Sequence, residues 1–420
     1  MRYSKKEVSR RKFIQGISIG TIGVGLNYSA LSASSTSSSN ILFPSVSETI
    51  AGKNVRSQFM LQPGLSYFNT GSLGPSPKRV FDKVSEITRE LELNPVGNNW
   101  GPIGNQANEV RNQLADYVNA DAEEIILTRN TTEGMNLVAS GLSLKEGDEI
   151  ITSTDEHYGG QAGWEFFEKY HGVKIRRVEF PKENITTDQV IGFIKKQITS
   201  RTRVCSFMDV STITGMRMPF KQLSEITKPK GILLVCDGAQ SAGMLEVDVQ
   251  KMGVDVFATS GHKWMLGPKE TGFLYIKEEV KSRIKSIQLE SGYKAYNHNT
   301  GTRNVANILG LGEAIKTQQS WGGITVIGEY NIALANHLRG KLKVIKRLQL
   351  ITPDEKNLQS GITSLYVPNQ DVKEIFEQLK QKNIVVKTLG KRNILRFSTH
   401  IFNTQEEVDH LVEQLSIFIK

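Results

Sequence analysis

Short apolar runs alternate with longer amphipathic stretches between residues 66 and 276. The runs lie at residues 123–128, 148–154, 174–180, 202–210, 231–237, 254–260 and 272–276. Helical spacing of apolar positions marks intervening segments such as 108–119 and 186–198. Runs that are apolar along their length are typical of strands covered on both faces, so the pattern predicts an α/β domain whose mostly parallel sheet is sandwiched by helices.

The pattern changes after the stretch at residues 301–316. A long helix is predicted over residues 325–345. Short apolar runs then alternate with amphipathic stretches at 371–382 and 404–419, which predicts a smaller α+β domain. The predicted organisation is an export signal at 1–33, an N-terminal segment at 34–65, a large domain at 66–300 and a small C-terminal domain at 301–420.

Polar clusters follow the ends of five apolar runs. They lie at residues 128–136, 153–160, 209–215, 237–243 and 259–263. In an open α/β sheet, ligands bind at the carboxyl ends of the strands. Five clusters at five such ends therefore predict one shared site.

The first 33 residues carry six basic side chains against one acidic side chain, so +5 of the net charge of +9 lies there and +4 remains elsewhere. Arg10-Arg11 precede a short Gly-rich apolar run and then small residues, the layout of a twin-arginine export signal. A basic amphipathic tail is the alternative interpretation. We expect the twin-arginine machinery to export the chain to the periplasm or beyond. Nucleic acid is not an expected partner, because no basic stripe with interleaved aromatics follows.

The chain has two cysteines, Cys205 and Cys236, both in predicted strands. Buried core cysteines are the favoured interpretation. Two strand cysteines do not make a disulfide framework. No His/Cys grouping has metal-ligand spacing, so no metal is expected.

Lys263 follows Ser260-Gly261-His262 between two apolar runs. Lysine is usually a solvated surface charge, but the flanking runs favour a buried turn here. Ser260 and His262 flank a glycine turn of the kind that binds anions. A desolvated lysine has a lowered pKa and forms Schiff bases with aldehydes.

Asp237 stands where a predicted buried strand ends. A buried carboxylate needs a cationic partner or several donors. A protonated pyridine nitrogen is such a partner, and Gln240, one turn further on, would reach an oxygen on the same ring. The alternative is that Asp237 caps the next helix.

Thr131 and Thr132 precede an apolar helical run, and the helix N-terminus with these hydroxyls would bind a phosphate. Simple N-capping is compatible with that role. His157 follows another strand and precedes two glycines, so its ring would stack on a flat cofactor or move a proton. Phosphate donors, a counter-ion for a ring nitrogen, a stacking ring and an aldehyde-trapping amine are together what pyridoxal 5'-phosphate requires.

These residues lie in motifs that resemble the class V aminotransferase family. The family belongs to the fold-type I pyridoxal-phosphate enzymes and includes cysteine desulfurases and isopenicillin N epimerase. The resemblance extends from residue 67 to residue 411, and its motifs read TTEGMNL, EHYG, DGAQS, SGHKW, GPKETGFLYI and GTRN. It implies a fold-type I transferase with a large cofactor-binding domain and a small C-terminal domain.

The resemblance also implies the cofactor contacts. Lys263 would hold the cofactor as a Schiff base and act in catalysis. Asp237 would pair with the pyridine nitrogen, Gln240 would contact the ring oxygen, and His157 would stack on the ring as a second catalytic group. The phosphate would be bound by Thr131, Thr132, Ser260 and His262.

Two further implications concern the partner subunit and the substrate. Thr302 would reach the phosphate in a neighbouring subunit, which implies a homodimer with shared active sites. Arg396 matches the arginine that binds the substrate α-carboxylate. The opening of the matched region looks closer to the isopenicillin N epimerase-like branch, where Asn69 and Ser72 would line the pocket.

The chain departs from the family in two places. Desulfurases carry a catalytic cysteine on the loop before the carboxylate-binding arginine, but residues 385–398 contain none. Sulfur extraction through a protein persulfide is therefore not expected. The family's asparagine beside the cofactor ring is replaced by Thr212, which weakens one ring contact.

The reaction common to the family removes the α-proton of an amino acid. Return of the proton to the opposite face gives epimerisation, its return to the cofactor gives transamination, and loss of a β-substituent gives a lyase. We expect transamination, or a related α-carbon reaction, on an amino acid or a peptide-borne amino group. Epimerase and C–S or β-elimination lyase are the alternatives. A cofactor-binding relic without turnover is the alternative from another class.

Overall fold

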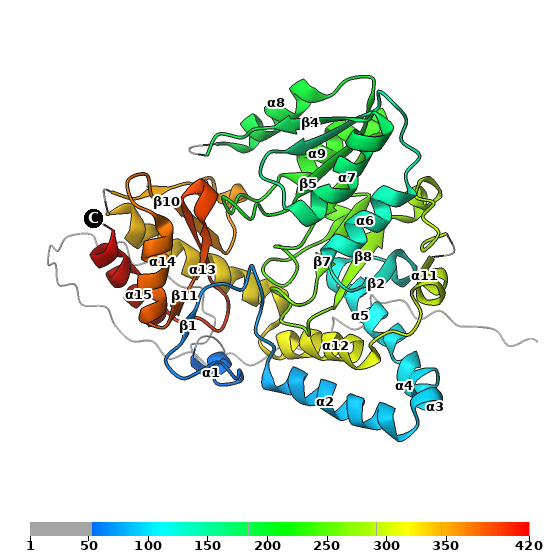
Figure 1. Cartoon of the computed structure of the whole chain (residues 1–420), viewed down its shortest axis with the longest axis horizontal. Coiled ribbons are helices and arrows are strands. Elements are labelled where there is room, and N and C mark those ends of the chain that lie inside the picture. Colours follow the sequence, from blue (N-terminus) through cyan, green and yellow to red (C-terminus); the bar gives the residue numbers. More distant parts are fainter. Residues whose placement is uncertain (1–52, 183–184, 291, 346, 420) are drawn as a thin grey trace, which may run out of the picture. The chain divides into compact units, whose positions relative to one another are not determined.

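A seven-stranded sheet organises the larger part of the chain in the computed structural model (Figure 1), which describes residues 53–182, 185–290, 292–345 and 347–419. Its strand order is β2-β8-β7-β6-β5-β3-β4. The strands are β2 (Ile125–Thr128), β3 (Glu149–Ser153), β4 (Lys174–Val178), β5 (Thr202–Met208), β6 (Leu233–Asp237), β7 (Val256–Ser260) and β8 (Gly272–Ile276). Strand β8 runs antiparallel to β2 and β7, and the other neighbouring pairs are parallel.

Each of the seven apolar runs contains one strand of this sheet, so the predicted fold class is confirmed. All residues of β2, β3, β6, β7 and β8 are buried. Strand β4 differs, because it lies at the edge of the sheet and only its last residue, Val178, is buried.

Hydrophobic clusters cover both faces of the sheet. Leu234 and Cys236 belong to one cluster, whereas their neighbours Leu233 and Val235 belong to another. This alternation is the period of two that a pleated strand imposes. The helices of this part are α2 (Lys78–Leu93), α3 (Pro95–Asn99), α4 (Pro102–Asn105), α5 (Ala107–Val118), α6 (Thr131–Gly141), α7 (Tyr158–His171), α8 (Thr187–Gln197), α9 (Phe220–Thr227), α10 (Val249–Met252), α11 (Gly292–Thr300) and α12 (Val305–Ser320).

The C-terminal part contains a four-stranded antiparallel sheet of order β12-β13-β10-β9. Its strands are β9 (Gln349–Leu350), β10 (Ile362–Tyr366), β12 (Lys387–Leu389) and β13 (Ile394–Ser398). The helices are α13 (Gly323–Lys343), α14 (Val372–Gln381) and α15 (Gln405–Phe418). The predicted long helix and the smaller α+β part are thus confirmed. The exact domain boundaries stay predictions.

An N-terminal strand joins this C-terminal part. Strand β1 (Ser66–Tyr67) pairs in parallel with β11 (Ile384–Val385). The backbone N–H of Ser398 donates to the carbonyl of Phe68 at 2.8 Å. The chain that follows β1 therefore runs beside the end of β13. A short helix, α1 (Lys53–Arg56), precedes β1.

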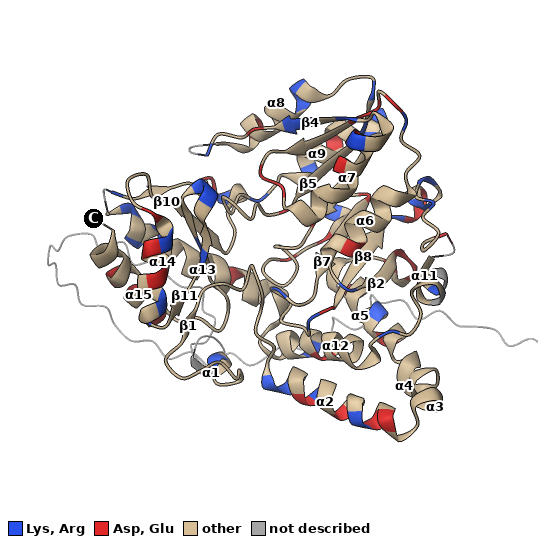
Figure 2. Ribbon diagram, in the orientation of Figure 1, with Lys and Arg blue, Asp and Glu red and all other residues tan. Residues whose placement is uncertain are grey.

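The expectations about the N-terminus lie outside the described residues, because the structure describes nothing before residue 53. Within the described ranges, no helix is both long and apolar enough to span a bilayer. Basic and acidic side chains are mixed along surface helices such as α2 and α14 (Figure 2). Cys205 and Cys236 are free and buried, as predicted.

Candidate active site

The five predicted polar clusters follow β2, β3, β5, β6 and β7. Hydrogen bonds join residues of these clusters with the segment that follows β1 and with Arg396 on β13. Most of the predicted site residues therefore lie together at the carboxyl ends of the parallel strands, where the topology of an open α/β sheet places a ligand.

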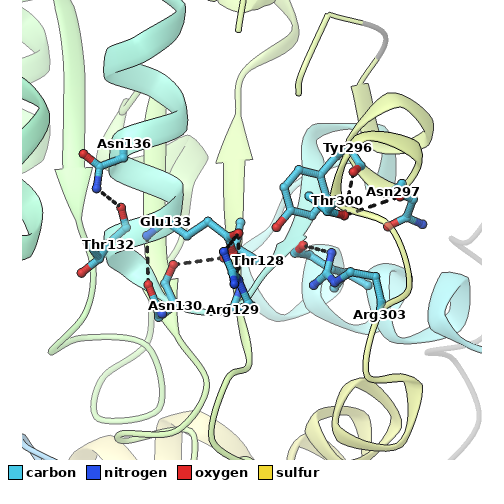
Figure 3. Close-up of polar contacts among 11 residues, drawn as sticks. Thr128, Arg129, Asn130, Thr132, Glu133, Asn136, Tyr296, Asn297, Thr300 and Arg303 are labelled. Atoms are coloured by element: carbon cyan, nitrogen blue, oxygen red, sulfur yellow. Dashed lines mark hydrogen bonds and ion pairs between the residues drawn. The ribbon is translucent and has the colours of Figure 1, made fainter. Parts of the chain in front are cut away.

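The N-terminus of α6 is the predicted phosphate-binding corner, and Figure 3 shows its polar contacts. Asn130 caps the helix, since its side-chain oxygen accepts from the backbone N–H of Glu133 at 2.9 Å. The hydroxyl of Ser260 accepts from the backbone N–H of Thr131 at 3.0 Å and lies 2.8 Å from the Thr131 hydroxyl. These contacts bring the clusters after β2 and β7 together. The helix dipole and the hydroxyls favour an anion here.

Thr132 and His262 are the other two residues predicted to bind the phosphate. A Cβ atom on Gly159 would lie 2.2 Å from the Thr132 hydroxyl, so the start of α7 closes directly over Thr132. His262 has a buried Nδ1 atom without a hydrogen-bond partner. Burial, together with the nearby Lys263 charge, lowers the pKa of His262 to about 4, so its ring is neutral at pH 7. A buried ring nitrogen without a partner is a feature that a bound phosphate would explain.

Asp237 is the last residue of β6, and it is buried. Its Oδ1 accepts from the backbone N–H of Ala239 at 2.9 Å. A Cβ atom on Gly160 would lie 2.6 Å from its Oδ2, so glycine is needed beside this oxygen. Burial raises the pKa of Asp237, while the charges of Lys263 and His157 oppose that change. This carboxylate suits a protonated ring nitrogen as its partner.

Lys263 follows β7, which pairs with the Asp237 strand β6. The residue as a whole is half-buried. Removal from water lowers the pKa of Lys263 to about 8, the Arg396 charge lowers it further, and the Asp237 charge opposes both effects. The turn is tightly packed, because a Cβ atom on Gly74 would lie 2.0 Å from the Lys263 carbonyl oxygen. The site thus holds a lysine amine that is partly neutral near pH 7.

His157 caps the N-terminus of α7. Its Nδ1 accepts from the backbone N–H of Gly159 at 3.1 Å, so the proton of the neutral ring lies on Nε2. Partial burial and the Lys263 charge lower the pKa of His157, while Asp237 raises it. The ring is exposed, and its predicted stacking on a cofactor stays a prediction.

Gln240 is held on both sides of its amide. Its Nε2 donates to the Gly71 carbonyl at 2.8 Å, and its Oε1 accepts from Trp264 Nε1 at 2.8 Å. Only the second Nε2 hydrogen remains for the predicted contact with a ring oxygen. That contact stays a prediction.

Arg396 lies on β13, and its side chain is buried among neutral oxygens. It donates to the hydroxyl and carbonyl of Thr212, and its Nη2 donates to Ser72 Oγ at 3.0 Å and to Asn69 Oδ1 at 3.3 Å. Burial lowers the pKa of Arg396 to about 10, so it remains charged at pH 7. The structure therefore groups Asn69, Ser72 and Thr212 around the predicted carboxylate-binding group.

Sequence reasoning missed Glu156. It accepts from Ser153 Oγ at 2.7 Å and from the backbone N–H of Met208 at 2.9 Å, and so links the ends of β3 and β5. Burial raises the pKa of Glu156 to about 8, and the nearby Asp237 charge contributes. Its position directly before His157 was the available signal.

Thr302 is exposed between α11 and α12 and makes none of the contacts above. With Trp100 and Arg303 it lines a cavity of about 550 Å³. Arg303 lies over the Tyr296 ring at 4.9 Å and donates to the Leu127 carbonyl at 3.0 Å (Figure 3). The predicted role of Thr302 in a neighbouring subunit stays a prediction.

The donor set fits pyridoxal 5'-phosphate. The α6 N-terminus and the partnerless His262 nitrogen suit the phosphate, the glycine-lined oxygen of Asp237 suits the ring nitrogen, and Lys263 suits the aldehyde. Among the residues that the structure describes, no cluster of three or more His, Cys, Asp or Glu side chains is placed to hold a metal ion.

Two solved structures have a similar fold. The apo structure of a cysteine desulfurase from Thermococcus onnurineus NA1 matches with a TM-score of 0.76 and 25% identity, covering 88% of this chain and 98% of that one. A C-DES mutant with glycine covalently linked to the PLP-cofactor matches with a TM-score of 0.77 and covers 86% of this chain and 99% of that one. Its 22% identity shows the fold alone.

Sequence comparison agrees with the fold. An isopenicillin N epimerase from Amycolatopsis lactamdurans is 30% identical over 391 residues, which cover 87% of this chain and 98% of the relative. The family model described as aminotransferase class-V matches residues 67–411. The chain therefore belongs to the class V aminotransferase family.

Proposed function

We propose that this chain is an exported pyridoxal-phosphate enzyme that acts at the α-carbon of an amino acid or a peptide-borne amino group, as an aminotransferase. Pyridoxal 5'-phosphate is its cofactor. The observation that carries the proposal is the placement of Lys263, with a pKa of about 8, beside the strand that ends in buried Asp237. Arg396 supplies a buried cation for the substrate carboxylate.

Bound at this site, pyridoxal phosphate spreads the negative charge left on the α-carbon when its proton departs. The Asp237 carboxylate keeps the ring nitrogen protonated. The Lys263 amine takes the α-proton and gives it back, since a pKa of about 8 suits both steps near neutral pH. Arg396 binds the substrate α-carboxylate, and its neutral neighbours hold the guanidinium in place.

The destination of the proton separates the candidate reactions. Transamination is the proposed outcome. Epimerisation is the second candidate, because a relative that matches 98% of its own length is an isopenicillin N epimerase. Sulfur transfer through a protein thiol is disfavoured, because both cysteines are buried in the sheet and burial raises the pKa of Cys205 to about 12.

We also propose the cellular setting. The basic and apolar pattern of residues 1–33 supports export by the twin-arginine machinery to the periplasm. Thr302 is exposed beside a cavity, which supports a homodimer in which it serves the neighbouring subunit. The joint presence of Lys263, Asp237 and Arg396 argues against a relic without turnover.

The test follows the amino group and the α-proton together. Purified holoenzyme is incubated in D₂O with amino acids and an α-keto acid acceptor, and products are analysed by chiral chromatography and mass spectrometry. Amino transfer to the acceptor supports the proposal. Inversion at the α-carbon without amino transfer assigns an epimerase instead. Absence of deuterium exchange with every substrate, in protein that carries the cofactor, overturns the enzyme proposal. Lys263→Ala should abolish exchange, whereas Lys269→Ala, an exposed lysine in the same loop, should keep it.

A further inference from the structure

A second lysine lies directly across the sheet from Arg396. Lys387 on β12 is the antiparallel partner of Arg396 on β13. Residues opposite each other in an antiparallel pair share a face of the sheet, with Cβ atoms about 4.5–5.5 Å apart. Because the Arg396 side chain reaches Thr212 and Ser72, the Lys387 side chain starts on the site-facing side of this sheet.

The electrostatics of His157 places the Lys387 charge beside the same site. His157 follows β3 in the large sheet, far from Lys387 in sequence, yet the charges of Lys263, Arg396 and Lys387 each lower its pKa. The Lys387 charge is therefore close enough to His157 to affect its protonation. Lys387 is partly exposed.

Charge matching leaves two of these cations without a counter-ion. Lys263 has Asp237 nearby, and Arg392, close to Lys387 in sequence, is paired with Asp155 at 2.5 Å. Across the described ranges, by contrast, no carboxylate forms an ion pair with Arg396 or Lys387.

Two buried polar atoms near Arg396 also lack partners. They are the Nε of Arg396 itself and the hydroxyl of Ser398, two residues further along β13. Buried polar groups in native proteins are nearly always satisfied, so these atoms indicate a polar ligand. One substrate α-carboxylate would form an ion pair with the Arg396 guanidinium, but the Lys387 ammonium would still have no counter-ion.

We propose that Lys387 and Arg396 form a two-cation subsite, and that the substrate is an amino acid with a second acidic group besides its α-carboxylate. This inference rests on the proposed function, because it assigns Arg396 to the α-carboxylate. Lys387 binds the second acid and determines specificity. An amino dicarboxylic acid is therefore preferred over its neutral amide, which has nearly the same size and shape.

The test compares acids with their amides on the holoenzyme. Dissociation constants are measured by calorimetry and by the change in cofactor absorption for L-glutamate, L-glutamine, L-aspartate, L-asparagine and L-alanine. At least one acid should bind roughly tenfold more tightly than its amide, since one partly desolvated charge pair contributes about one factor of ten. Lys387→Met should remove that preference and leave amide and alanine binding unchanged, and Lys387→Arg should retain it. Lys382→Met, which removes an exposed charge from the end of α14, should behave like wild type.

Two results overturn the inference alone. One is equal binding of acids and amides by wild-type protein. The other is an equal loss for all five ligands in Lys387→Met, which would mean that Lys387 binds the α-carboxylate together with Arg396. If alanine and every other probe fail to bind protein that carries the cofactor, the proposed function falls and this inference falls with it.

Discussion

The Lys263 amine should combine with the cofactor aldehyde with a pH midpoint near 8. Burial and the Arg396 charge lower its pKa to about 8 from the usual 10.5. At pH 7 a pKa of about 8 leaves roughly a tenth of the amine neutral, whereas 10.5 leaves roughly 0.03%. Only the neutral amine attacks an aldehyde. At pH 7 its reactive fraction is therefore about 300 times that of an ordinary lysine.

Two substitutions should move this midpoint in opposite directions. Asp237 raises the pKa of Lys263, so Asp237→Asn should lower the midpoint. Arg396 lowers that pKa, so Arg396→Met should raise it. Asp237→Asn should also slow turnover, because the ring nitrogen loses its counter-ion. Faster reaction of Lys263 with the cofactor aldehyde, combined with slower turnover of substrate, is a result for Asp237→Asn that unfolding would not produce.

The assay uses protein stripped of cofactor. Pyridoxal phosphate is added at a series of pH values from about 6 to 10, and the rate of absorbance change is fitted to a single ionisation. Lys269→Met serves as the control, because Lys269 is exposed in the same loop. A rate that keeps rising to pH 10 without a midpoint, or a midpoint that rises in Asp237→Asn, would refute the reasoning.

Three further outcomes are expected. Glu156 has a folded-state pKa of about 8, above its usual 4.5, so the stability that it contributes is complete below pH 4.5 and is lost as the pH rises through 8. The free energy of unfolding in urea should therefore fall less between pH 5 and pH 9 in Glu156→Gln than in wild type. Gly160→Ala should displace the Asp237 carboxylate, because the new Cβ would lie 2.6 Å from Asp237 Oδ2, and should weaken cofactor binding about tenfold in titrations. Unchanged affinity would contradict this. Arg396→Lys keeps the charge but loses contacts with Thr212, so amino-acid binding should weaken by about tenfold or more. Binding of simple amines without a carboxylate should stay as in wild type, and a parallel loss for both ligand classes would contradict this.

The sheet was predictable because its strands are buried on both faces and are therefore apolar along their whole length. Strand β8, for example, is buried throughout between β7 and β2. Pairing between distant segments was not predictable. The parallel pair of Ser66–Tyr67 with Ile384–Val385 joins segments more than 300 residues apart, and no local pattern specifies that register.

The site was partly predictable for the same reason. Polar residues directly after buried strands had to meet at one edge, and the structure brings Thr131 and Ser260 into contact there. What the pattern could not show was how side chains are used once they meet. The Gln240 amide is held by Gly71 and Trp264, and the placement of Lys387 beside Arg396 depends on strand register.

Borohydride trapping shows directly whether Lys263 carries the cofactor. The cofactor-loaded protein is reduced with borohydride, digested and mapped by mass spectrometry. We expect a pyridoxyl-phosphate adduct on the peptide that contains Lys263, and its loss in Lys263→Ala. An adduct on any other lysine, or no adduct in fully loaded protein, would contradict it.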